Sequence, residues 1–357
     1  MIVSAPMLKR LGRAQSATMT WLGEESVSLR ERQALRCIAW RLFLTCWLVY
    51  VLHFATNTVR EIYPALSLGD HLSFDVSEYV GLHPDIFEMP GRGAYINNNP
   101  GASILGAITY WAVRPFSDWA VAAVQRARAT SDEPPAEYDT IYPMAQEFYR
   151  EARARGLDVK FGIAAGVMQF FLMAPLSALS AVVMFYLLRS LTHSTRKALA
   201  LAVLYAFATP VFYRTAQLNQ NLLVSHSALF AFALLWRPWD RPSQPGRPRF
   251  LWAGLLVGWT VVLDYSGLVV VLVLGLYALA RWRSVPPALR SLGDLGRFAA
   301  SVAFGFAILG GYQWGAFGHP LYPAQHYMPP ANFTEYGYRG MDWPRLDLLG
   351  ELAFSIR

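Results

Sequence analysis

Long apolar blocks alternate with short polar ones along most of this chain. A transmembrane helix needs about 20 mostly apolar residues. Residues 250–281 are too long for one span, and we divide them at Asp264–Gly267, because a charged residue beside glycine indicates a turn and is costly at the centre of a bilayer. The pattern therefore predicts an all-α integral membrane protein with seven spans: 38–58, 163–188, 198–213, 221–236, 298–317 and the two arms of 250–281.

One further apolar segment, 100–116, is predicted to lie in the outer membrane interface. It has about 17 residues, which is the lower limit for a span. The loops that join the later spans hold eleven Lys and Arg residues against two acids. Positive charge concentrates on the cytoplasmic side. These loops share that side with the basic tail of residues 1–37 only if 100–116 does not span. The loops are 189–197, 237–249 and 281–297.

This topology places the N-terminus in the cytoplasm of a cell inner or plasma membrane and leaves one very long outer loop, 59–162. Within that loop, Asn99 and Pro100 suit the start of a helix, as N-cap and first helical residue. Residues 142–155 are amphipathic, which indicates a second helix lying flat on the membrane. Residues 318–357 are predicted to form a terminal outer loop and the approach to a further helix.

The composition agrees with a polytopic membrane protein. Hydrophobic residues make up 54% of the chain and charged residues 15%, against about 25% in soluble proteins. The net charge of +7 is spread over short loops without a basic, aromatic-lined face, which excludes a nucleic-acid partner. Cys37 and Cys46 lie nine residues apart on one predicted helix, too far apart to pair, so there is no disulfide framework.

The candidate chemistry lies in a polar run, residues 70–101, which follows the first span and carries five acids. On a helix leaving the membrane, Asp75, Glu78 and Tyr79 would share one face. Two neighbouring carboxylates raise the pKa of one of them, which prepares a general base, and their oxygens also suit a divalent cation. Asp70 is a third candidate acid. The alternative is an acidic helix face that only contacts water.

Other polar residues are candidates for binding a substrate. Asp85 follows Pro84 and would be a second acid, a metal ligand or the cap of a following helix. Arg92, between two glycines, is suited to a phosphate. Arg214 at a membrane exit would bind a lipid phosphate or anchor its helix at the headgroups. Three consecutive amides exceed what a helix cap needs and would also bind sugar hydroxyls: Asn97, Asn98 and Asn99.

Residues 38–330 resemble the GT-C type of membrane glycosyltransferases, which includes protein mannosyltransferases and lipid A aminoarabinose transferases. The resemblance rests on D-x-x-E-Y at 75–79, T-P-x-x-Y-R at 209–214 and a G-x-x-x-G hairpin with a polar turn. It implies a seven-span N-terminal module, a sugar donor on polyprenyl phosphate, and an Asp or Glu of the first outer loop as catalytic acid/base. In this chain Glu does not directly follow Asp75, and Asp264 stands where the family often has Lys or Arg.

The hypothesis is therefore a membrane glycosyltransferase that works on the extracytoplasmic face. Asp75 would deprotonate an acceptor hydroxyl, Glu78 or Asp70 would assist it, and Arg92 and Arg214 would hold the donor phosphate. An apolar groove between spans would hold the prenyl chain. A divalent cation is the one cofactor considered. The competing hypotheses are a multi-pass transporter, which would need ionisable groups along a pathway through the membrane, and a non-catalytic membrane protein.

Overall fold

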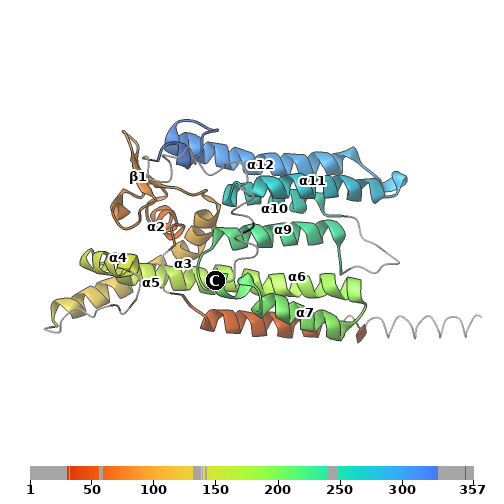
Figure 1. The fold of residues 1–357 in the computed structure, drawn as a ribbon, viewed down its shortest axis with the longest axis horizontal. Helices are drawn as coiled ribbons and strands as arrows, with labels where there is room; N and C mark the ends of the chain where they lie inside the picture. The colour runs from red at the N-terminus through yellow and green to blue at the C-terminus, as the bar shows by residue number, and fades with distance from the viewer. Residues whose placement is uncertain are drawn as a thin grey trace, which may run out of the picture.

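The structure is a computed structural model, which describes residues 30–31, 33–55, 59–131, 138, 140, 143–239, 248–328 and 350. It is mostly helical, as the sequence predicts. Long helices lie side by side along the longest axis of the molecule, and smaller elements gather beyond one end of them (Figure 1). Most of the predicted basic tail, and the terminal loop from residue 329 except residue 350, lie outside the described residues.

Among the described residues, four helices are long and apolar enough to cross a membrane. They are the first helix (Gln33–Leu52), the continuous helix Asp158–Thr192, α11 (Gly267–Ser284) and α12 (Leu292–Phe317). Two apolar helices are shorter, α9 (Gln220–Trp236) and α10 (Phe250–Leu263), and α7 (Thr195–Phe207) has 13 residues. These apolar helices indicate a membrane protein. The full set of seven spans stays a prediction.

The predicted division of residues 250–281 is confirmed. Helix α10 ends at Leu263 and α11 begins at Gly267, so the break falls within the predicted polar turn. The Asp264 carboxylate accepts the Ser266 backbone N–H at 2.8 Å, which stabilises the turn. Helix α12 then packs closely on α10, where Gly258 and Gly305 face each other with no room for a side chain between them.

The helix Asp158–Thr192 covers the predicted second span and is not regular throughout. Helix α5 (Asp158–Met168) passes through a π-helical segment, Gln169–Met173, into α6 (Ala174–Thr192). Pro175 has no N–H to donate to the preceding turn, so a local change of helix type just before it is expected. The irregular segment therefore ends two residues before Pro175.

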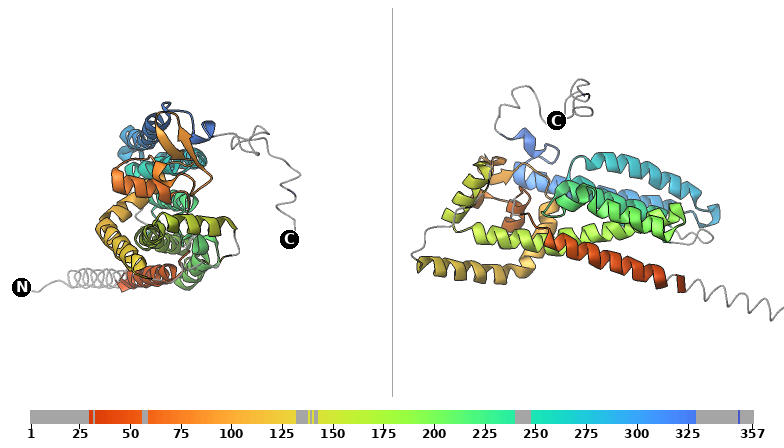
Figure 2. Two further views of the ribbon diagram at one scale, coloured as in Figure 1. Left: turned by 90° about the vertical axis from the view of Figure 1, so that its left-hand side faces the viewer. Right: turned by 60° about the horizontal axis from the view of Figure 1, so that its bottom comes forward.

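The long polar loop folds into several short elements and one helix of 29 residues, at one end of the long helices (Figures 1 and 2). They are α2 (Ile62–His71), the short 3-10 helix Ser77–Tyr79, the antiparallel strands β1 (Ile86–Met89) and β2 (Gly93–Ile96), α3 (Gly101–Ala129) and α4 (Pro143–Ala154). We call this group the polar layer. The α6–α7 and α11–α12 connections lie at the opposite end (Figure 1).

Helix α3 is longer than the predicted segment 100–116 and continues through Pro115 to Ala129. It is not among the helices suited to cross a membrane. Its aromatic side chains Trp111, Phe116 and Trp119 are each about 60% exposed, at 64%, 59% and 62%. Exposed Trp residues are typical of a helix at a membrane interface. Helix α4 matches the amphipathic segment predicted at 142–155 to within one residue at each end.

Candidate functional site

Asp75 lies in the turn before the 3-10 helix and is fixed by the strand hairpin. Its Oδ1 atom accepts hydrogen bonds from the Ala94 backbone N–H at 3.0 Å and from the Ser77 hydroxyl at 2.5 Å and backbone N–H at 3.0 Å. Its own carbonyl oxygen accepts the Ser67 hydroxyl of α2. Gly93 has a positive φ of 99°, and any Cβ there would collide with the Asp75 carboxylate. The hairpin backbone is thus built around this carboxylate.

The predicted helix face of Asp75, Glu78 and Tyr79 is wrong, because helix α2 ends at His71 and Asp75 precedes a helix of only three residues. The expected rise in pKa from a carboxylate pair is also absent at Asp75. Partial burial raises the pKa of this carboxyl, but hydrogen bonds from the Ser77 hydroxyl and the Ala94 and Ser77 N–H groups outweigh it and lower the pKa. Asp75 is therefore ionised at neutral pH.

Asp70 belongs to a separate, buried ion network. Its Oδ2 lies 2.7 Å from Lys160 Nζ of α5, and its Oδ1 lies 3.2 Å from Arg114 Nε and accepts the Tyr110 hydroxyl of α3 at 3.2 Å. The Asp70 side chain is 6% exposed and that of Lys160 16%. Asp70 therefore ties α2 to α3 and α5, and its contacts are those of a structural ion pair.

Glu78 and Tyr79 meet the same lysine. Glu78 Oε1 lies 3.9 Å from Lys160 Nζ, and Lys160 donates to the Tyr79 hydroxyl at 3.4 Å. Tyr79 is fully buried, so it is a core residue and no surface for a substrate. Within the described part of the chain, no three His, Cys, Asp or Glu side chains come close enough to hold a metal ion.

The three asparagines lie between β2 and α3, against the α10–α11 turn. Asn98 and Asn99 are buried, and the Asn99 side chain donates to the Val261 carbonyl of α10 at 2.9 Å. Helix α3 begins at Gly101 without a side-chain cap, so the prediction that Asn99 caps it is wrong. Asn97 Oδ1 and Asn98 Nδ2 are buried polar atoms without a hydrogen-bond partner among the described residues.

Arg92 and Asp85 both make contacts that connect parts of the fold. Arg92 donates to the Gly315 carbonyl of α12 at 3.0 Å, which joins the hairpin to the end of that helix. Asp85 pairs with Arg60 at 3.3 Å. Of the three interpretations of Asp85, the cap of a following helix is wrong, since strand β1 follows it. Partial burial lowers the pKa of the nearby His83, so this imidazole is neutral at pH 7.

Arg214 ends α8 (Pro210–Arg214), between α7 and α9. Its Nε donates to the hydroxyl of its neighbour Tyr213 at 3.3 Å, and its guanidinium lies over the Tyr213 ring. Asp264, besides holding its turn, accepts the Gln220 side-chain amide at 2.9 Å. The interpretation of Asp264 as a turn residue is confirmed.

Glu61 is the acid that sequence reasoning missed. It precedes α2 and is only 5% exposed. Burial raises the pKa of its carboxyl, against the lowering effects of its own N–H, of Arg60 and of the Gln220 N–H at the start of α9; Asp264 raises it further. Its position as the first acid after the first apolar block was the one available signal, because its partners Gln220 and Asp264 lie about 160 and 200 positions later.

Glu61 gives a prediction for the pH dependence of stability. Its pKa is raised in the fold, so the folded protein holds a proton that the unfolded chain releases. Unfolding free energy should therefore fall as the pH rises above the ordinary pKa of a glutamic acid, by about 1.4 kcal/mol for each unit of raised pKa. Glu61→Gln should flatten this slope, measured by denaturant unfolding in detergent. An exposed acid, Glu88→Gln, should leave it unchanged; an unchanged slope in Glu61→Gln would contradict the assignment.

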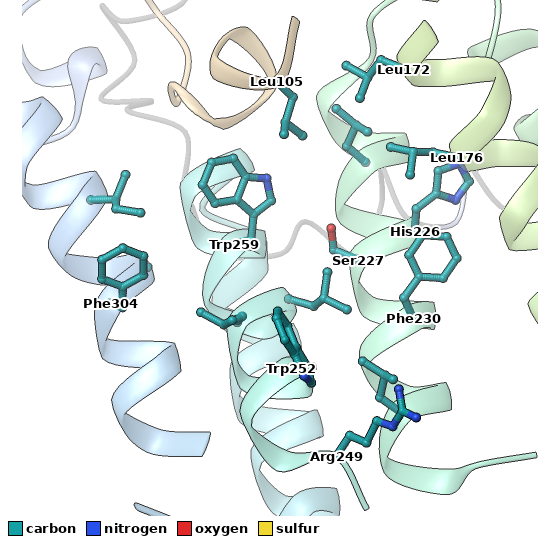
Figure 3. A pocket seen from close by; sticks show the side chains of 16 residues that line it. Leu105, Leu172, Leu176, His226, Ser227, Phe230, Arg249, Trp252, Trp259 and Phe304 are labelled. Carbon is teal, nitrogen blue, oxygen red and sulfur yellow. The ribbon is translucent and has the colours of Figure 1, made fainter. Parts of the chain in front are cut away.

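An apolar groove of about 650 Å³ lies between α6 and α9 on one side and α10 and α12 on the other (Figure 3). Leu105 of α3 and Trp259 line one end, beside the polar layer, and Arg249 lies at the other end (Figure 3). Leucine, phenylalanine and tryptophan side chains make up most of its wall. Such a lining suits a flexible apolar chain.

A second cavity, of about 510 Å³, is polar and lies between the polar layer and the start of α9. Residues before and in α2, the 82–85 loop, α4 and the start of α9 line it: Val59, Arg60, Glu61, Tyr63, Leu82, His83, Pro84, Asp85, Ala145, Phe148, Tyr149, Gln217, Asn219 and Asn221. The buried Glu61 and the Arg60–Asp85 pair therefore share one cavity, whereas Asp75 and Asp70 do not line it.

No protein-family model matches this chain, and neither the curated proteins nor the solved structures contain a significant match to it.

Proposed function

We propose that this protein is a membrane glycosyltransferase that moves a sugar from polyprenyl phosphate to an acceptor hydroxyl. The observation that carries the proposal is the apolar groove that ends at the polar layer. A donor of this kind has a long apolar chain and a polar, reactive head, so it needs both environments next to each other. The proposed architecture is the seven-span module of GT-C enzymes, with the polar layer on the extracytoplasmic side.

In this proposal Asp75 is the base. It takes the proton of the acceptor hydroxyl, whose oxygen attacks the anomeric carbon. The bond from that carbon to the phosphate oxygen breaks, and its electron pair leaves on the phosphate. Hydrogen bonds to Oδ1 fix the carboxylate and keep it ionised. A carboxylate with a low pKa is a weak base, so proton transfer would follow, not precede, most of the attack.

Of the two proposed phosphate ligands, Arg214 has fewer contacts to give up. Its guanidinium bonds only to its neighbouring tyrosine among the contacts of the described residues. Arg92, in contrast, already donates to carbonyl oxygens at the end of α12 and would have to release them. A charged guanidinium would stabilise the phosphate as it leaves.

Asp75→Asn should lower transfer at least 100-fold, because a general base contributes about 10²–10⁴-fold. The amide oxygen still accepts the Ala94 and Ser77 N–H groups, so the hairpin stays intact. Transfer is measured with purified protein and radiolabelled polyprenyl-phosphate sugars, and Glu88→Gln, an exposed acid on β1, is the control. Full activity in Asp75→Asn rules out Asp75 as the base. No transfer by the unaltered protein from any of these donors contradicts the proposed function.

A further inference from the structure

The polar cavity between Glu61, Asp85 and the start of α9 has no role in the mechanism above. It has about 510 Å³, within the range of small-molecule sites. Four separate parts of the chain build it, from residue 59 to residue 221, so a local turn does not account for it. One of its lining residues, Glu61, is 95% buried, and the backbone N–H groups of Glu61 itself and of Gln220 bond to its carboxyl.

Two of the charged groups around this cavity neutralise each other. Arg60 and Asp85 face each other at 3.3 Å and form a pair. Burial holds Glu61 protonated more readily than an exposed acid, and it holds His83 in its neutral form. The remaining polar side chains are the amides of Gln217, Asn219 and Asn221 and the hydroxyls of Tyr63 and Tyr149. Because Arg60 and Asp85 already pair, a charged ligand would lose its hydration without gaining an unpaired partner from them.

The side chains that remain match a neutral, hydroxyl-rich ligand. Amide groups and a carboxyl both donate and accept, so they can satisfy hydroxyl groups that do the same. Phe148 and Tyr149 from α4 add aromatic surface, on which the C–H face of a sugar ring packs. Asn219 is partly used, because its side chain caps α9 through Leu222 N–H at 2.9 Å. Asn221, two residues later, is exposed at the cavity.

We infer that this cavity is a binding site for an uncharged saccharide, with Glu61 and Asn221 among its hydrogen-bonding groups. The inference deepens the proposed function and rests on it for the source of the sugar, which would be the acceptor molecule or the donor head. The cavity is separate from Asp75, so it would position a sugar and would not carry the base.

The test measures binding without transfer. The full chain in lipid nanodiscs is mixed with the methyl glycosides of mannose, glucose and galactose, and with glucuronate as the charged analogue, and binding is followed by saturation-transfer NMR. At least one neutral glycoside should bind, at least tenfold more tightly than glucuronate. Asn221→Trp, which fills the cavity, should lose at least tenfold in affinity. Ser225→Trp, one helical turn further along α9 and outside the cavity lining, should bind normally.

Glu61→Gln separates binding from folding. It should weaken glycoside binding by several-fold while raising stability at neutral pH, two effects that a purely structural role would not combine. The inference is overturned if no neutral glycoside binds, if glucuronate binds equally, or if Asn221→Trp binds normally. Binding without any transfer would instead uphold this site and contradict the glycosyltransferase.

Discussion

Lys160→Met should lower the unfolding free energy by about 3–5 kcal/mol, the usual cost of removing one partner from a buried ion pair. Lys160 Nζ lies 2.7 Å from Asp70, and both side chains are largely buried. Without the lysine, Asp70 keeps only Arg114 as a cationic partner, and the arginine side chain is 40% exposed. Glu78 and Tyr79 lose the same contact. Denaturant unfolding in detergent measures the change.

The controls for Lys160→Met test the charge, not the length of the side chain. Lys197→Met, at an exposed site at the start of α7, should change stability by less than about 0.5 kcal/mol. Adding Asp70→Asn to Lys160→Met should recover part of the loss, because the double variant no longer buries an unpaired charge. If the double variant is as unstable as the two single losses added together, the pair is not coupled and the assignment fails.

Gly305→Leu should separate α10 from α12 and cost about 3 kcal/mol, the upper end of the usual penalty for overfilling a packed interior. A Cβ atom at Gly305 would overlap the backbone carbonyl of Gly258, and backbone cannot turn aside as a flexible side chain does. Small residues at such crossings allow helices in membranes to approach closely. Thermal unfolding in detergent and the distance between spin labels on the two helices measure the effect.

Gly311→Leu is the matched control for this change. Gly311 lies on the same helix, and a Cβ there meets nothing within 4 Å. The two variants therefore share the gain in helix propensity that follows the loss of glycine. Equal stability of the two variants would show that α10 and α12 do not touch at Gly305.

The sequence predicted well those features that depend on local pattern. The break at Asp264–Gly267 is visible because a charge and a glycine interrupt an apolar block of about 30 residues, and the amphipathic α4 because its polar and apolar residues repeat with the helical period. The hairpin β1–β2 was also readable, since Pro90 to Gly93 form a turn signal between two short apolar stretches. It was missed because the acids were assigned to a helix.

What sequence could not predict was the partner of each polar group. Asp70 and Lys160 are 90 residues apart, and Asn99 bonds to a carbonyl 162 positions away. The Glu61 carboxyl meets the Gln220 N–H and the charge of Asp264, whose distance along the chain hides them from any local pattern. The acids that looked alike in the sequence therefore separate into an ion pair at Asp70, an ionised turn residue at Asp75 and a buried carboxyl at Glu61.

The contact between Arg92 and α12 has a consequence for the order in which the protein is made. The hairpin that fixes Asp75 is synthesised early, but the carbonyls that hold Arg92 lie 222 and 223 residues later. Chains emerge from the ribosome at about 5–20 residues per second, and their N-terminal parts fold first. The hairpin must therefore wait tens of seconds, through the insertion of every intervening helix, before its anchor exists. A ribosome stalled before residue 314 would leave Arg92 without its carbonyl partners on α12.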